Sequence, residues 1–522
     1  MLKKRMMNSP ATDRVADKLL MLDLLAQVRR PMRRSVGLLG LVVLAQSLFL
    51  IAIGSAYALP FLIVSISSWL AFAAGVFGNT GGLPVFAVFM LQHGIVYGFP
   101  LAVSNKALEK YESNVVLQSS IAYVLFVVTA IVGWQIGKSL LRSGSSKWIL
   151  FEQGSVHLTN RFIARTGIAL LVLPIIYQIS LITNVYWYIT GQYGLSLFSI
   201  AQAISGACQV SGGFLGSYAC SRLPSHRLAF WSVWISLFTF LMATVLLSSA
   251  TGLVIGTLGG LYLGTKRMAW IPAIGIFAVL GFLNIGKFDM RTRYWSDQHG
   301  MQVTLPQLPG FFAEWISASA KKVSSRNDEF AKEQDKGQSL TDRILGFENL
   351  AFATRALTNL GYEPMNGAGY AVLPKVFIPR LLWKDKPRSH EGQVMLNLHF
   401  DRQRDVKATE RTYVAWGLLP EAIGNFGIWI GAIGFGLVAG FATGVIETWS
   451  TRKSLLSLEG VGACILMIYA FISFEMAAGV LAGTLFQTGI VIVVGGFVLI
   501  QFRKRSRPKL QSRRPAVMPA RS

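Results

Sequence analysis

Long apolar stretches recur along almost the whole chain, and they constrain its fold more than any other feature. A helix that crosses a bilayer needs about 20 apolar residues, because inside hydrocarbon every backbone polar group must be paired. Stretches of this length predict about twelve transmembrane helices, and therefore an all-α, polytopic membrane protein. They lie near residues 36–56, 58–78, 83–104, 117–138, 163–187, 194–215, 226–247, 249–265, 268–288, 426–447, 457–480 and 483–502.

The charge content agrees with this fold class. Charged residues make up only 14% of the 522-residue chain, whereas a soluble protein carries about 25%. The three cysteines, Cys208, Cys220 and Cys464, lie in or beside apolar stretches. They predict neither a disulfide framework nor a metal site.

The basic residues are concentrated at the two ends of the chain. Residues 1–34 contain nine Lys or Arg, and residues 503–522 contain eight with no acid. Basic tails can bind nucleic acid, but tails that adjoin apolar spans are explained more simply by the positive-inside rule. We therefore expect no nucleic-acid partner. An even number of spans places both tails in the cytoplasm.

The same rule orients the connecting segments. Most short loops predicted to lie outside are nearly free of basic residues, except for one loop in which Lys106 and Lys110 are balanced by Glu109 and Glu112. The predicted organisation is a cytoplasmic tail (1–34), a bundle of about nine helices (35–288), a large extracytoplasmic loop (289–415), the last three transmembrane helices (416–502) and a second cytoplasmic tail (503–522).

The large extracytoplasmic loop is too long to be a simple connection, and we expect it to contain amphipathic helices. Phe311–Val323 has the pattern of one such helix. A second is predicted to begin near the capping-box pattern Ser339-x-x-Asp342 and to stop at Gly361. We expect the apolar face of this second helix to lie on the membrane surface. Its other face carries Glu348, Phe352, Arg355 and Asn359.

A cationic cluster beside a tryptophan follows these helices. Arg presents a fixed fork of donors that suits phosphate, and Lys supplies a point charge. At the outer membrane face, such a cluster suits the headgroup of a lipid-linked diphosphate. Trp and Lys are also common interfacial anchors, and both interpretations remain open. The residues are Arg380, Trp383, Lys384, Lys386 and Arg388.

Several acidic and polar residues lie near the outer ends of the last spans. Glu421 and Asn425 are four residues apart and share a helix face. A carboxylate in or near a bilayer is costly, so Glu421 and Glu475 are candidate bases or counter-charges to the cations. His390 is a weaker candidate for proton transfer. Glycines at positions 424, 427, 431, 436, 440 and 444 predict close helix packing.

A second group of charges follows the ninth predicted span. Lys287, Arg291 and Arg293 either line the same cavity as the cationic cluster or form a solvated helix end. No P-loop, GxGxxG, HExxH or paired CxxC pattern occurs in the sequence. We therefore expect no nucleotide cofactor and no metal.

The order of these features resembles that of the Wzy-type repeat-unit polymerases of bacterial O-antigen and exopolysaccharide. The resemblance covers residues 345–430 and departs from the family at Lys384, where a proline is expected. The matching residues are Arg355, the segment Gly367-Ala368-Gly369-Tyr370, the string Ile378-Pro379-Arg380-x-x-Trp383-x-Asp385-Lys386-Pro387, and Glu421-x-x-x-Asn425-Phe426-Gly427.

The resemblance implies a GT-C-like glycosyltransferase of the bacterial inner membrane that acts on its periplasmic face without a metal. Its substrate would be a polyprenyl-diphosphate-linked oligosaccharide, and its partners would include a flippase and a chain-length regulator. Arg380 and Arg355 would hold the diphosphate, assisted by Lys386 and Arg388, and Glu421 would be the base. An O-antigen-ligase-like transferase and a transporter of lipid-linked sugars are the alternatives.

Overall fold

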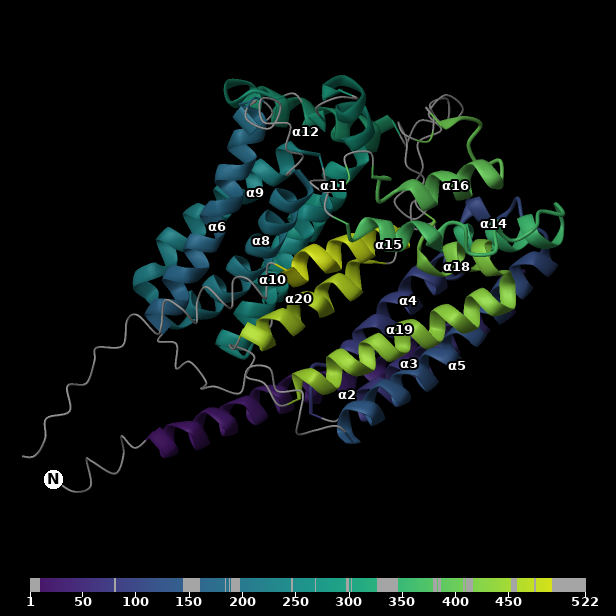
Figure 1. Ribbon diagram of the computed structural model, residues 1–522, viewed down its shortest axis with the longest axis horizontal. Helices are drawn as coiled ribbons and strands as arrows, with labels where there is room; N and C mark the ends of the chain where they lie inside the picture. Colours follow the sequence, from purple (N-terminus) through teal and green to yellow (C-terminus); the bar gives the residue numbers. More distant parts are fainter. Residues whose placement is uncertain are drawn as a thin grey trace, which may run out of the picture.

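The protein is almost wholly helical in the part of the chain that the structure describes (Figure 1). The computed structural model describes residues 10–78, 81–143, 160–183, 185–186, 188, 198–245, 247–267, 269–296, 300–301, 303–325, 346–378, 383, 386–406, 409, 416–451, 458–473 and 476–490.

The helices form two bundles, each with its own apolar core. Two later helices, α20 (Leu458–Ile472) and Ala478–Ile490, lie between the bundles, where α20 contacts α4 and α19 on one side and α8 and α10 on the other (Figure 1). The first bundle contains α2 (Pro10–Ala52), α3 (Ala58–Phe77), α4 (Val85–Ala102), α5 (Ser113–Ser143) and α19 (Ile428–Ser450). The second contains α6 (Asn160–Ile182), α8 (Phe198–Arg222), α9 (Arg227–Ala243), α10 (Leu247–Thr265) and α11 (Trp270–Tyr294).

Eight helices among the described residues are long and apolar enough to cross a membrane. This confirms the prediction of an α-helical membrane protein, while twelve spans remain a prediction. All twelve predicted segments contain helix. The segment 194–215 contains α8, which is not among the eight helices that are long and apolar enough to span. Three other segments contain only shorter apolar helices, Ala250–Thr265, Gly462–Phe471 and Ala478–Ile490. The eight are Arg29–Ala52, Ala58–Phe77, Val85–Ala102, Ser113–Leu140, Asn160–Ile182, Pro224–Ala243, Trp270–Lys287 and Ile428–Ser450.

Glycines bring α19 into close contact with α5. A Cβ atom added at Gly440 would overlap the carbonyl oxygen of Ala130, and one at Gly444 would overlap that of Trp134. Gly434, on another side of α19, has nothing within 4 Å of the same position. The glycine spacing therefore acts as predicted, because the small residues let two backbones approach.

Short elements cover the end of the molecule at which α11 and α19 meet the large loop (Figure 1). The helix predicted at Phe311–Val323 is present as part of α12, which packs against α11. These elements are η1 (Lys106–Leu108), β1 (Trp295–Ser296) paired antiparallel with β2 (Gly300–Met301), η3 (Leu305–Gln307), α12 (Leu308–Ser325), α14 (Gly346–Thr358), η4 (Tyr370–Val372), α15 (Leu373–Val376), α16 (Glu391–His399) and α18 (Leu418–Phe426). A further short helix, η2 (Pro224–His226), joins α8 to α9.

The expectation that α14 lies on the membrane surface was wrong. Its apolar residues Phe347, Leu350 and Ala351 are fully buried in the core of the first bundle, where α14 packs against α4, α5 and α18. The apolar face is therefore covered by protein. The predicted capping box at Ser339 and Asp342 lies outside the described residues.

Two helix boundaries also differ from those predicted. α2 continues without interruption from Pro10 through the predicted start of the first span. The last helical hairpin turns between Ile472 and Ala478, rather than near residue 481 as the apolar pattern indicated. A contact from α18, described below, explains the second difference.

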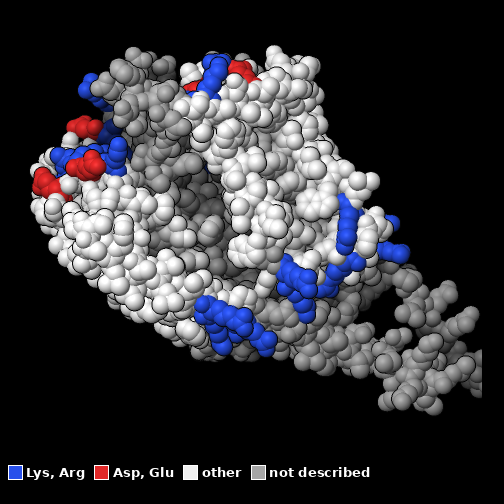
Figure 2. Space-filling model, turned by 180° about the vertical axis from the view of Figure 1, so that it is seen from behind, with Lys and Arg blue, Asp and Glu red and all other residues white. Residues whose placement is uncertain are grey.

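The two ends of the molecule differ in charge. One end, near the N-terminal helix, shows Lys and Arg side chains without acids, whereas the opposite end shows both signs (Figure 2). This asymmetry among the described residues is what the positive-inside rule leads us to expect.

Candidate functional site

Glu421 and Asn425 lie on α18, a short buried helix between two glycines. Gly417 and Gly427 have φ angles of 84° and 83°, which favour glycine, and they set the two ends of the helix. The amide of Asn425 donates from Nδ2 to the carbonyl oxygen of Glu421 at 2.9 Å. The sequence prediction that these residues share a face is confirmed by this bond.

Asn425 holds the segment Gly367–Tyr370 against α18. The backbone N–H of Gly369 donates to Asn425 Oδ1 at 2.9 Å, and that of Gly367 donates to the Asn425 carbonyl at 3.1 Å. A Cβ atom at Gly369 would lie 2.9 Å from Asn425 Oδ1, so only glycine fits without a shift. Asn425 thus positions the backbone beside the site, and Tyr370 packs its ring 5.4 Å from that of Phe426.

The carboxylate of Glu421 caps the helix Ala478–Ile490. Glu421 is 2% exposed, and its Oε2 accepts a hydrogen bond from the backbone N–H of Ala478 at 2.7 Å. The first N–H groups of a helix lack partners within it, and the helix dipole favours negative charge there. This contact explains why the last hairpin turns before Ala478.

Burial controls the protonation of this acid. It raises the pKa of Glu421 to about 7, although the hydrogen bond from Ala478 acts in the opposite direction. Burial, followed by the neighbouring Glu421, raises the pKa of Tyr370 well above its usual value. A carboxylate with a pKa near 7 can accept and release a proton at neutral pH.

The helix Ala478–Ile490 also contacts the cationic segment. Phe377 packs its ring 5.1 Å from that of Phe486, and a Cβ atom at Gly479 would overlap the carbonyl oxygen of Ser389. The fold therefore brings α18, Phe377 and Ser389 against the same helix, Ala478–Ile490.

The cations of this segment have different surroundings. Lys386 donates from Nζ to the carbonyls of Val376 and Ile378, both at 2.7 Å. Trp383 is half-buried and Arg388 is exposed. Arg380, Lys384 and Glu475 lie outside the described residues.

His390 is half-buried near Arg388, directly before α16. Burial lowers its pKa, a hydrogen bond with Gln393 raises it, and the charge of Arg388 lowers it further. The ring is therefore neutral over most of the physiological pH range, which is the form able to accept a proton.

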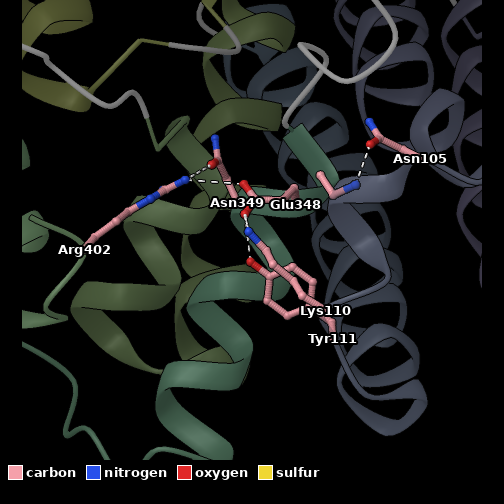
Figure 3. A network of polar contacts seen from close by, with 7 residues as sticks. Asn105, Lys110, Tyr111, Glu348, Asn349 and Arg402 are labelled. Atoms are coloured by element: carbon pink, nitrogen blue, oxygen red, sulfur yellow. Dashed lines mark hydrogen bonds and ion pairs between the residues drawn. The ribbon is translucent and has the colours of Figure 1, made fainter. Parts of the chain in front are cut away.

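A buried ion network ties α14 to the loop between α4 and α5 (Figure 3). Glu348 Oε1 accepts hydrogen bonds from Lys110 Nζ and Tyr111 Oη, each at 2.8 Å. Arg355, also on α14, has its guanidinium carbon 6.0 Å from the ring centre of Tyr111. The polar face predicted for this helix therefore faces the charged loop between α4 and α5, which the sequence predicts to be extracytoplasmic.

Arg402 completes the network, and the sequence did not single it out. Its Nη2 donates to Asn349 Oδ1 at 2.7 Å and lies 3.3 Å from Glu348 Oε2. The guanidinium packs 4.8 Å from the ring centre of Phe352 and 5.5 Å from that of Trp416. The signal available in the sequence was the unusual charge of the loop that carries Lys110.

The third group of predicted residues lies on α11, in the second bundle, apart from α18 (Figure 1). Arg293 pairs with Glu314 on α12, and Lys322 on α12 binds Asp289 Oδ1 at 2.8 Å. α11 packs mainly on α12 and α10. Lys287, Arg291 and Arg293 therefore belong to a hairpin of their own, and burial lowers the pKa of Arg291.

Comparisons with known proteins identify no relative: no protein-family model, curated protein or solved structure matches the chain. Among the described residues, no group of three or more His, Cys, Asp or Glu side chains is placed to hold a metal ion.

Proposed function

We propose that this protein is a membrane glycosyltransferase that polymerises lipid-linked oligosaccharide repeats on the extracytoplasmic face of a bacterial inner membrane. The observation that carries the proposal is that a buried acid, Glu421, and Ser389, which follows the cation Arg388, contact adjacent residues of one helix, Ala478 and Gly479. The acid has a pKa of about 7. This pairing suits a reaction that needs a base and a stabilised anionic leaving group.

The reaction would proceed by direct transfer. A sugar hydroxyl of one lipid-linked repeat attacks the anomeric carbon of the glycan on a second carrier, forming the glycosidic bond. The bond from that carbon to the diphosphate oxygen breaks. The hydroxyl proton passes to Glu421, and the leaving polyprenyl diphosphate keeps the electron pair.

The cations would stabilise the charge that develops on the diphosphate. Arg380 and the exposed Arg388 are suited to direct contact, since guanidinium groups bind phosphate oxygens in pairs. Lys386 would act mainly by shaping the segment, because its ammonium already binds two carbonyls. Arg355 would assist from α14.

The test is transfer activity of the purified protein in nanodiscs with lipid-linked repeats. Arg380→Ala and Arg388→Ala should lower the rate by about 100-fold, as loss of a charge-stabilising donor does in other enzymes. Lys106→Ala is the matched control, because Lys106 is an exposed cation on another outer loop. Wild-type chain length and rate in Arg380→Ala would refute the role of the cations.

The products separate the proposed polymerase from its rivals. A polymerase gives a ladder of chains on the carrier lipid, whereas a ligase-like enzyme gives a single transfer to a lipid core or protein acceptor. A transporter moves its substrate across the bilayer without forming a bond. A periplasmic reporter fused near Gln334 tests the orientation, and a signal only from a cytoplasmic reporter would overturn it.

A further inference from the structure

A depression in the protein surface lies at the junction of α18 and α19. It has a volume of about 240 Å³, which is smaller than a typical pocket for a drug-sized ligand. Three segments meet there: the end of α14, the turn that follows it, and the first residues of α19. The lining residues are Leu357, Gly361, Tyr362, Glu363, Pro364, Gly427, Ile428 and Trp429.

The backbone around the depression is fixed by local contacts. The hydroxyl of Tyr362 donates to Asp401 Oδ2 at 2.7 Å, and His399 Nε2 lies 2.7 Å from the carbonyl oxygen of Glu363. Gly361 and Gly427 have φ angles of 72° and 83° and carry no side chain to fill the space. The depression is therefore a formed feature of the fold.

The lining has the chemistry of a sugar site. Trp429 is 48% exposed, so part of its indole is available for the C–H groups of a pyranose ring to pack on. Tyr362 donates its own proton to Asp401, which leaves its oxygen able to accept a hydrogen bond from a sugar hydroxyl. The exposed Glu363 adds an acidic acceptor.

The depression is connected to the buried acid through α18. Glu421 and Gly427 are six residues apart on this helix, which corresponds to about 9 Å along its axis. Between them, Phe426 is 40% exposed and packs against Tyr370, whose pKa responds to Glu421. Phe426 directly precedes Gly427, which lines the depression, so the backbone of α18 connects the acid to the depression.

We propose that the depression is a glycan subsite, which binds a sugar ring of a lipid-linked oligosaccharide next to the reacting one. The inference rests on the proposed function for its substrate class and deepens it. Trp429 lies in the first turn of the α19 span, so the subsite is at the depth of the membrane interface, where the sugars nearest the lipid carrier lie.

The test measures binding apart from catalysis. Saturation-transfer NMR and titration with the soluble, lipid-free repeat oligosaccharide should give a Kd that rises about tenfold in Trp429→Ala, the effect of losing one aromatic stacking contact. Glu363→Gln should weaken binding in the same direction. In transfer assays, both variants should raise KM for the glycan more than they lower kcat.

Trp449→Ala is the matched control, because Trp449 is 38% exposed at the other end of the same helix. If Trp429 were only an interfacial anchor, the two tryptophan variants would bind the oligosaccharide equally well, and the subsite would be refuted. A phospholipid lost from Trp429→Ala in native mass spectrometry, with unchanged sugar binding, would refute it in favour of a lipid site.

Failure of the proposed function has a different signature. Glycan binding that depends on Trp429, in a protein that forms no glycosidic bond, supports the subsite and rejects the polymerase. If the protein polymerises the repeats and Trp429→Ala binds the oligosaccharide with the wild-type Kd, the polymerase is supported and the subsite is rejected.

Discussion

Replacing Glu348 with Met should destabilise the protein strongly, because it leaves a buried arginine without its charged partner. The side chains of Glu348 and Arg402 are 7% and 13% exposed, whereas that of Lys110 is 57% exposed. Removing one member of a buried ion pair typically costs about 3–5 kcal/mol. Arg402 keeps its bond to Asn349, so we expect the lower end of this range, about 3 kcal/mol.

Two further variants test whether this loss of stability comes from the unpaired buried charge of Arg402. Lys110→Met removes an exposed partner of the same carboxylate and should cost less than about 1 kcal/mol. The double variant Glu348→Met/Arg402→Met removes both buried charges and should be more stable than Glu348→Met alone, since apolar pairs often replace buried ion pairs without loss.

The assay is unfolding of the purified protein in mixed micelles with increasing SDS, followed by tryptophan fluorescence. The rate of protease cleavage after α14 gives a second measure, which reports local unfolding around this helix. The reasoning is refuted if Glu348→Met unfolds at the same SDS fraction as Lys110→Met, or if removing Arg402 in addition lowers stability further.

Three other changes test separate parts of the structure. Gly440→Ala should lower the free energy of unfolding by about 1–3 kcal/mol, because the added methyl group overlaps α5. In Gly434→Ala the added methyl group meets nothing within 4 Å, so the free energy of unfolding should not change. Because burial raises the pKa of Glu421 from 4.5 to about 7, the folded protein keeps a proton that the unfolded chain releases; stability should therefore fall by about 3 kcal/mol as pH rises through this range. Unfolding curves of Glu421→Gln across the same pH range should lack this decline, and an identical decline would show that another group causes it. Lys386→Ala removes two hydrogen bonds to carbonyls and should lower the free energy of unfolding by about 1–3 kcal/mol, whereas Arg388→Ala, at an exposed position, should lower it by less than about 1 kcal/mol.

The parts of the site that the sequence predicted are those that depend on short separations. The four-residue spacing of Glu421 and Asn425 places them on one face of α18, and the glycine spacing of α19 produces its contact with α5. The polar face of α14 was also predicted, because helical periodicity is visible over a few turns. The sequence did not predict which residues this face would contact.

The sequence by itself determined that this is a helical membrane protein with charges concentrated at its ends, because hydropathy and charge act over the length of a single segment. Only the tertiary structure decided which charges meet. Glu421 reaches the N–H of Ala478 across 57 residues, and Lys110 reaches Glu348 across 238. Such pairs leave no periodic signal in either segment, since they are formed when separate helices pack. For the same reason, hydropathy alone does not locate the turn of the last hairpin, whose second helix begins at Ala478, where the carboxylate of Glu421 accepts the backbone N–H.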